Sequence, residues 1–392
     1  MKKNGYHTVA FQAANPFLSK FYGYHRGFDI FKDFLDGDKE SKQIEKKISS
    51  SNEKQKNKYI LRVKPFLDKL PILKKIFKTL FGKKGYYTDK EYKKYIKKIE
   101  NNNLPFIRGE IINKSISNWL ADYNDKKPLF LWIHYMDIHQ PHVPQEHILS
   151  ELNLPKYDKK IIARHWAEIS THYIRNKKQV EELIDLYDAE IRYTDGCIEK
   201  LFKIFHKNGI TKENSFFILT ADHGEEFGEH GGLGHEMKLY NEMLSVPLIF
   251  YGKKSKNFDK HSASLVELKD IPAIILNIAS GKKITDISKE FVISQSLRKE
   301  KNQWTRLVSL QNKNYKLIYD EKDQLNNEFY NLTNDVYERD NLINDSSFGE
   351  IIKEFTGIIN EFLRTTSYSE KFKKRSLQKI REIQSQFNKK NS

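Results

Sequence analysis

The sequence predicts an α/β protein with a mostly parallel central sheet flanked by helices. Four short apolar runs have the length and composition of buried strands. Stretches with helical periodicity lie between them, and this alternation favours parallel strands joined by crossover helices. With 392 residues, the chain is long enough for one large core or two unequal ones.

Each element is expected at a definite place along the chain. The apolar runs predict strands at 6–11, 129–134, 216–220 and 246–251. Periodic apolar positions predict a helix over 110–120 and a long helical stretch from 161 to about 206. Later segments predict a small antiparallel unit, then a helix that starts near 348. The predicted organisation is an α/β domain over 1–300, an antiparallel subdomain over 301–345, and a C-terminal helix with a polar tail over 346–392.

A change in composition over 37–103 predicts a basic insert in the first domain. Within it, apolar residues recur at helical spacing over 72–81, with lysines between them. A helix packed on its own domain is the simplest interpretation. The alternatives are a lid over a substrate cleft and peripheral contact of 59–84 with an anionic membrane surface.

Charge and cysteine content limit the possible partners and compartments. Lys and Arg number 68 against 52 Asp and Glu, for a net charge of +16. The lysines are scattered and no nucleic-acid-binding module is recognisable, so we expect no nucleic-acid partner. A basic surface would instead attract an anionic ester. The chain has one cysteine, no apolar run of membrane-spanning length and no signal peptide before Gly5. We therefore expect a cytoplasmic protein without a transmembrane segment.

The densest chemical signal is the loop TADHGEEFGEHGGLGHE, which directly follows the predicted strand at 216–220. Carboxylates and imidazoles bind divalent metals and anions, and α/β sheets place ligands at the carboxyl ends of their strands. Any one of these residues taken alone is more easily explained as part of a solvated acidic turn. Their density predicts a metal or anion site, whose candidate residues are Asp222, His223, Glu225, Glu226, Glu229, His230 and His235.

This loop resembles the second metal-binding motif of the sulfatases of the alkaline phosphatase superfamily, with TADHGE followed by GEHG, GH, YNE and VPLI. Three other stretches are similar to family segments in the same order: GYHTVAFQAANPFLSKFYGYHRGFDIF, PLFLWIHYMDIHQPHVP and FYNLTNDVYERDNL. The resemblance covers about residues 5–345. It implies an alkaline phosphatase-like fold and metal-dependent hydrolysis of sulfate esters, with an anionic small-molecule or glycan ester as substrate.

The resemblance implies roles for four residues. Asp222 and His223 match the family's second pair of metal ligands, for a divalent cation expected to be Ca²⁺, with Mn²⁺, Zn²⁺ and Mg²⁺ as alternatives. His139, in DIHQPH, matches the histidine that contacts the sulfuryl oxygens or the leaving group. His235 falls where many family members carry a sulfate-binding lysine, so an anion-binding or general-acid role is implied.

Other polar residues near these motifs are weaker candidates. Asp137 is expected on the same face as His139 if the strand at 129–134 extends that far. His134 and His142 are expected to be mostly structural, and His230 is a minor candidate.

The start of the sequence departs from the family pattern. Family members begin with a strand that carries two metal-ligating aspartates, followed by a CxPSR-like motif whose Cys or Ser is matured to formylglycine. This sequence opens on the segment downstream of them, and Cys197 lies in a helical pattern that predicts a packing role. We therefore expect either that the true start lies upstream or that the gene has lost its first segment. With two of the ligands that a metal needs, the chain alone is expected to bind metal weakly and to hydrolyse esters poorly.

Three alternatives to a sulfatase stay open. A phosphodiesterase or phosphonate monoester hydrolase of the same superfamily is the nearest, because DHG in place of DNG mildly favours a phosphoryl substrate. A non-catalytic remnant that binds sulfated or phosphorylated glycans is the second. A basic nucleic-acid-binding protein is the third and the least favoured.

Overall fold

The computed structural model describes residues 1–35, 96–99, 104–169, 176–235, 237–282, 286–300 and 303–366. The basic insert predicted over 37–103 lies outside these ranges except for a helical turn at 96–99. The helix expected at 72–81, the membrane contact expected through 59–84 and the polar tail after 366 also lie outside them. These three stay predictions.

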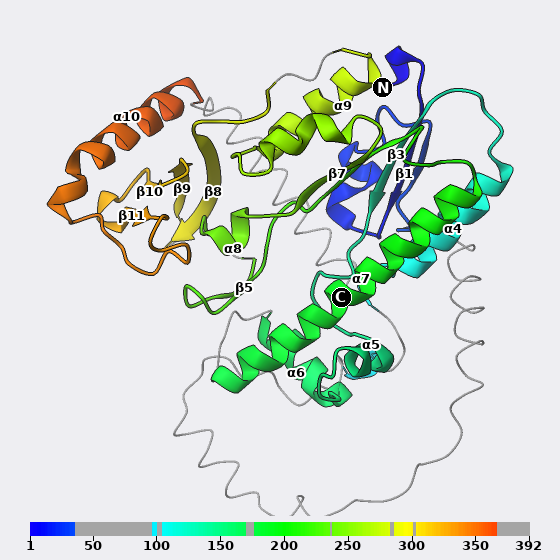
Figure 1. The fold of residues 1–392 in the computed structure, drawn as a ribbon. Coiled ribbons are helices and arrows are strands. Elements are labelled where there is room, and N and C mark those ends of the chain that lie inside the picture. Colours follow the sequence, from blue (N-terminus) through cyan, green and yellow to red (C-terminus); the bar gives the residue numbers. More distant parts are fainter. Residues whose placement is uncertain are drawn as a thin grey trace, which may run out of the picture.

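Three parallel strands form the sheet nearest the N-terminus. β1 (His7–Gln12) is central, between β2 (Ile30–Lys32) and β3 (Leu129–His134). In register, His7 is paired with Leu129, and Gln12 with His134. Helices α4 (Gly109–Asp122) and α7 (Lys177–Lys207) cover one face of this sheet (Figure 1). The shared core is apolar and includes Val9, Phe11, Ile112, Ile116, Leu201 and Phe205.

A second pair of strands, β4 (Phe216–Thr220) and β7 (Leu248–Gly252), is antiparallel. Aromatic contacts of Phe217 join the pair to α7 on one side. On the other side, Phe258 and Ile274 of η5 (Ser255–His261) and α9 (Ile271–Ala279) pack against it. Among its described residues, the connection between β4 and β7 has the β5–β6 hairpin (Glu226–Phe227, Leu233–Gly234) and the one-turn helix α8 (Asn241–Leu244). Without a crossover helix of sufficient length, β7 returns antiparallel.

The predicted α/β class is confirmed, but two of its strands are less buried than expected. The side chains of β3 and most of those of β4 are half-buried, whereas five of the six residues of β1 are buried. The reason is position within the sheets. β1 has a neighbour on each side, whereas β3 and β4 are outer strands of their sheets in the part of the chain that the structure describes.

The stretch predicted to be helical from 161 to about 206 contains two helices, α6 (Lys159–Ile169) and α7. With α5 (Glu146–Glu151), α6 packs on the N-terminal half of α7, while the C-terminal half of α7 meets the sheets (Figure 1). The short strand β2 was not expected, because three residues are too few to show a period.

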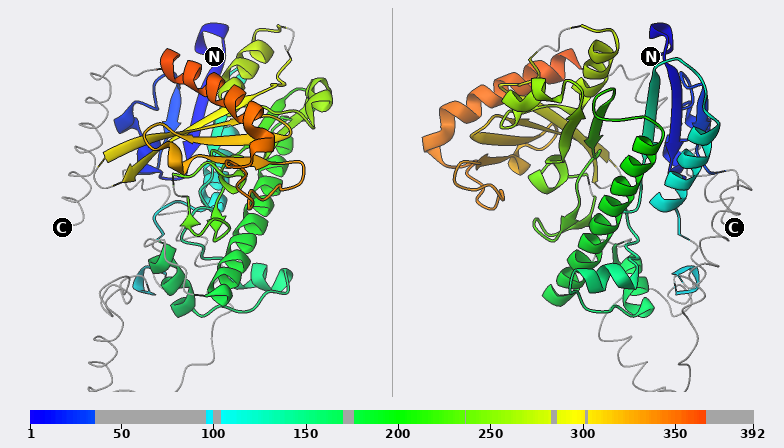
Figure 2. Two further views of the ribbon diagram at one scale, coloured as in Figure 1. Left: turned by 90° about the vertical axis from the view of Figure 1, so that its left-hand side faces the viewer. Right: turned by 45° about the vertical axis from the view of Figure 1, so that its right-hand side comes forward.

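The expected C-terminal antiparallel subdomain is confirmed. Its sheet has the order β11-β10-β9-β8. Helix α10 (Gly349–Thr365) lies across one face of this sheet (Figure 2) and places Phe355 and Ile359 in its core. The first strand begins at Val292, ahead of the boundary expected at 300. Its strands are β8 (Val292–Glu300), β9 (Gln303–Gln311), β10 (Tyr315–Asp320) and β11 (Glu328–Asn331).

Over the described ranges, the structure contains no helix that combines the length and the hydropathy needed to cross a bilayer.

Candidate active site

Three imidazoles from two separate parts of the sequence meet near the carboxyl ends of β3 and β4. The ring centroids of His139 and His235 are 5.0 Å apart, and those of His223 and His235 are 4.7 Å apart. Asp222 is adjacent, with its Oδ1 3.9 Å from Nε2 of His223. The structure therefore brings together all four residues that the sequence singled out.

His223 is held by the sharp turn that follows β4. A Cβ on Gly224 would lie 1.8 Å from the backbone oxygen of Glu242, so only glycine allows this close approach. The turn is fixed by a hydrogen bond from the N–H of Gly224 to the carbonyl of Met243 at 2.9 Å. Nδ1 of His223 lies 2.7 Å from the carbonyl oxygen of Gly224. Because a carbonyl only accepts, Nδ1 is assigned the proton, and Nε2 keeps a lone pair for a ligand.

Asp222 and His223 fit two positions of a metal site. A cation bonded to each at about 2.0–2.4 Å would span the 3.9 Å between Oδ1 and Nε2. The Asp222 side chain is 84% exposed and therefore within reach of a cation. Over the described ranges, however, no group of three or more His, Cys, Asp or Glu is arranged to hold a metal ion. The pair fits a cation without completing its coordination shell.

His139 is fixed by its own loop. Its N–H donates to the carbonyl of Met136 at 3.0 Å, and its Nδ1 lies 2.6 Å from the carbonyl oxygen of Gln140. Burial lowers the pKa of His139, although the Gln140 carbonyl opposes this change. The imidazole is therefore neutral near pH 7, and its Nε2 is free to accept a hydrogen bond or a proton.

Glu225 had no individual role among the sequence-based predictions, yet its carboxylate faces the cluster. Oε2 of Glu225 lies 3.6 Å from Nδ1 of His235, a distance typical of an ion pair rather than a direct hydrogen bond. Its Oε1 is buried and has no hydrogen-bond partner among the described residues. Glu225 raises the pKa of His235 against the effect of burial. Its position directly after Asp222-His223-Gly224 was the only signal that could have indicated this.

His134 and His142, expected to be mostly structural, lie beside the four predicted residues. His142 is buried, and its ring centroid lies 5.5 Å from that of Tyr187. Burial lowers the pKa of His142 to about 4. Neither ring nitrogen of His142 has a hydrogen-bond partner among the described residues. Burial also lowers the pKa of His134, and Asp222 is close enough for its charge to oppose that effect.

The condition set for Asp137 is not met. β3 ends at His134, and Asp137 is fully buried. Its carboxylate accepts hydrogen bonds from the N–H of Gly109 and pairs with Arg108, which also binds Glu190. A buried carboxylate needs donors, and it finds them at the start of α4.

His230 and Cys197 have structural contacts. Nδ1 of His230 lies 2.6 Å from Oε1 of Glu242, and its Nε2 lies 2.9 Å from the backbone oxygen of Glu338. Both nitrogens are therefore occupied: Nδ1 by Glu242 of α8, and Nε2 by the C-terminal subdomain. Cys197 is buried in α7, and burial raises its pKa to about 11, as expected for a packing residue rather than a nucleophile.

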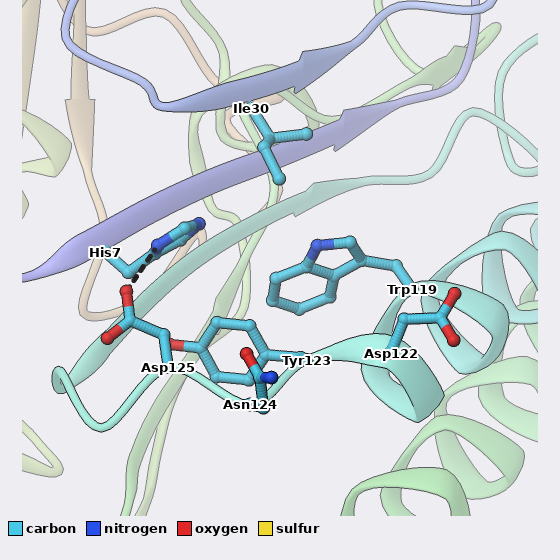
Figure 3. Close-up of a pocket in the computed structure, with 7 residues that line it drawn as sticks. All are labelled: His7, Ile30, Trp119, Asp122, Tyr123, Asn124 and Asp125. Carbon is cyan, nitrogen blue, oxygen red and sulfur yellow. Dashed lines mark hydrogen bonds and ion pairs between the residues drawn. The ribbon is translucent and has the colours of Figure 1, made fainter.

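A cavity of about 540 Å³ lies at the opposite end of the parallel strands (Figure 3). There Nδ1 of His7, the first residue of β1, lies 3.1 Å from Oδ2 of Asp125. The cavity is lined by none of the four predicted site residues. Its lining residues are His7, Ile30, Trp119, Asp122, Tyr123, Asn124 and Asp125. The candidate active site therefore depends on the convergence of side chains rather than on this cavity.

Because Glu190 is buried, we expect the free energy of unfolding to depend on pH. Burial raises its pKa from 4.5 to about 7, so in that window the folded chain holds a proton that the unfolded chain releases. The free energy of unfolding is therefore expected to fall, by about 1–3 kcal/mol, as pH rises through the window. Urea unfolding at several pH values should show that Glu190→Gln reduces this fall, to which the buried Asp137, with a pKa raised to about 6 by burial, also contributes. The exposed Glu199→Gln is the control, and parallel pH profiles for wild type and Glu190→Gln would contradict the prediction.

An α/β core with imidazoles and a carboxylate at its strand ends, followed by an antiparallel subdomain, defines a protein of the alkaline phosphatase-like fold. The model of the Sulfatase family matches residues 1–281, and the chain belongs to that family.

The chain is also similar to individual proteins, in sequence or in fold. The chain is 23% identical over 223 residues to the Delta 4,5-hexuronate-2-O-sulfatase of Bacteroides thetaiotaomicron, a match that covers 51% of this chain and 43% of the relative. The chain thus spans less than half the length of that relative. Its fold is similar to the phosphonate monoester hydrolase of Agrobacterium radiobacter, with TM-score 0.58, 12% identity, and coverage of 94% and 79% of the two chains. A 2-O GAG sulfatase has TM-score 0.50, 13% identity, and coverage of 93% and 73%.

Proposed function

We propose that the chain acts in the hydrolysis of sulfate esters, with an anionic glycan ester as the substrate class. The main support is the convergence of His139, His223 and His235 in a chain of the Sulfatase family. The Delta 4,5-hexuronate-2-O-sulfatase relative supports a glycan substrate. The net charge of +16 favours attraction of an anion.

The proposed chemistry gives His235 and His139 separate tasks. His235, whose pKa is raised by Glu225, is positively charged over a wider pH range and binds a non-bridging oxygen of the ester. His139 keeps its Nδ1 proton on the Gln140 carbonyl, while its Nε2 first takes up a proton from water and then passes that proton to the leaving oxygen. The proposal assigns binding and proton transfer to these side chains and leaves the nucleophile unassigned.

A divalent cation would be held by Asp222 and His223, with Ca²⁺ proposed first and Mn²⁺, Zn²⁺ and Mg²⁺ as alternatives. Once bound, such an ion neutralises charge on the non-bridging oxygens and polarises the ester. Because the two donors do not complete a coordination shell, we propose weak binding by this chain alone.

Removing the Asp222 carboxylate is expected to weaken divalent-cation binding by about tenfold or more, since it removes one of two donors. Calorimetric titration with CaCl₂ and MnCl₂ would measure this for wild type, Asp222→Asn and His223→Ala. Asp195→Asn, an exposed aspartate on α7, is the matched control. Wild-type binding tighter than about 1 μM would contradict the weak site, and equal affinity in Asp222→Asn would contradict the ligand assignment.

A phosphoryl-ester hydrolase is the second candidate. It is favoured by His223 directly after Asp222, and the shared fold with a phosphonate monoester hydrolase is compatible with it. Turnover of 4-nitrophenyl sulfate, a 4-nitrophenyl phosphonate monoester and a 2-O-sulfated unsaturated hexuronate disaccharide, each with added cations, separates the candidates. Faster turnover of the sulfates supports the first proposal. Faster turnover of the phosphonate favours the second, and sulfate binding without turnover favours a non-catalytic glycan-binding protein.

A further inference from the structure

One buried arginine connects three elements around the loop that carries His139. Arg108 lies just before α4 and is 6% exposed. Its Nε is 3.4 Å from Oδ1 of Asp137, in the loop after β3, and its Nη1 is 3.0 Å from both carboxylate oxygens of Glu190, on α7. Both acidic side chains are fully buried.

The two carboxylates hold the His139 loop on either side of the imidazole. Asp137 precedes His139 by two residues, and its oxygens accept from the N–H of Gly109 at 3.1 and 3.0 Å. After His139, the N–H of Val143 donates to Oε1 of Glu190 at 2.9 Å. Asp137 and Glu190, which hold the loop at these two points, both contact the guanidinium of Arg108.

Close packing restricts any movement of this arrangement. A Cβ on Gly109 would lie 3.0 Å from Oδ2 of Asp137 and 3.1 Å from Sγ of Cys197, so α4 approaches the loop closely. The guanidinium carbon of Arg108 lies 4.2 Å from the ring centroid of Tyr193. An ammonium group in place of the guanidinium could not reach both carboxylates and cover this ring at once.

We propose that Arg108, Asp137 and Glu190 form a clamp that sets the position of His139. Its effect on catalysis rests on the proposed function. All three are positioning residues, because they act through the loop rather than on the ester. A buried polar cluster adds little net stability compared with apolar packing, and here we expect it to specify one geometry. For an imidazole on a loop, that geometry decides whether Nε2 meets the leaving oxygen.

The test uses an arginine-to-lysine pair within a double-mutant cycle. Arg108→Lys is expected to lower kcat/KM by about tenfold or more in the wild-type background and by less than about twofold in the His139→Ala background. Arg192→Lys is the matched control, because Arg192 is an exposed arginine on α7 paired with Glu151. It should change kcat/KM by less than about twofold in both backgrounds. An equal loss for Arg108→Lys in both backgrounds would overturn the clamp.

A second readout separates failure of the clamp from failure of the proposed function. The ¹H–¹³C resonance of the His139 ring, assigned by its loss in His139→Ala, is expected to move in Arg108→Lys and in the milder Glu190→Gln, but not in Arg192→Lys. If wild type hydrolyses no ester yet the resonance moves, the proposed function fails and the clamp stands. If esters are hydrolysed and the resonance is unchanged in folded Glu190→Gln, the clamp fails and the proposed function stands.

Discussion

Replacing Glu338 by alanine is expected to lower the free energy of unfolding by about 3–5 kcal/mol, the largest stability effect of any single change considered. Nζ of Lys316 lies 2.6 Å from Oε1 of Glu338, and both side chains are fully buried. The contact lacks the alignment of a hydrogen bond, so it is an ion pair. Alanine at 338 leaves the Lys316 ammonium in the interior without its opposite charge, and the desolvation cost is no longer offset.

The remaining contacts of this pair increase the expected loss. Oε2 of Glu338 accepts from the N–H of Asn241 at 2.6 Å, and Nζ of Lys316 donates to Oδ1 of Asn241 at 3.1 Å. Burial lowers the pKa of Lys316, and in the alanine variant nothing at position 338 opposes that effect. Part of the loss is therefore expected to be relieved at high pH, where the ammonium deprotonates.

Equilibrium unfolding in urea measures this prediction. Glu361→Ala is the control, because Glu361 pairs with Arg364 on the exposed surface of α10. This substitution is expected to lower the free energy of unfolding by less than about 1 kcal/mol. Adding Lys316→Met to Glu338→Ala should recover much of the loss, since it removes the buried charge. A loss below about 1 kcal/mol in Glu338→Ala would contradict the prediction.

Replacing His139 by alanine is expected to lower kcat/KM by about 10²–10³-fold with little change in stability. The ring is held by its own loop through Gln140, so its removal disturbs few other contacts. If Nε2 passes a proton taken up from water to the leaving oxygen, the loss depends on the leaving group. It should be larger for a glycan sulfate than for 4-nitrophenyl sulfate, whose leaving group is stable as an anion.

Steady-state kinetics on both substrates, with thermal unfolding to confirm folding, tests this expectation. His147→Ala, an exposed histidine at the start of α5, is the matched control and should leave kcat/KM within about twofold. A uniform loss for both substrates would indicate that His139 binds the ester without transferring a proton. Unchanged kinetics in folded His139→Ala would remove His139 from the proposed site.

The sequence predicted the fold class, the family and the four residues that converge. Asp222, His223 and His235 belong to one short glycine-rich loop after an apolar strand, and His139 follows a second apolar strand. Because strand ends gather at one edge of an α/β sheet, residues that follow strands can be placed together without coordinates. The roles of these residues, the identity of the cation and a cytoplasmic location stay predictions.

The tertiary structure decided which neighbours of those residues face the site. Asp137, two residues before His139, turns inward to Arg108, whereas Glu225, two residues after His223, faces His235. Sequence spacing could not show which of the two carboxylates faces the site, because the answer depends on where β3 ends. It also depends on which distant donor meets each buried charge, and both Arg108 and Glu190 lie far from the motifs in sequence. Local chemistry is encoded by neighbours along the chain, whereas charge burial is settled only when separate elements pack.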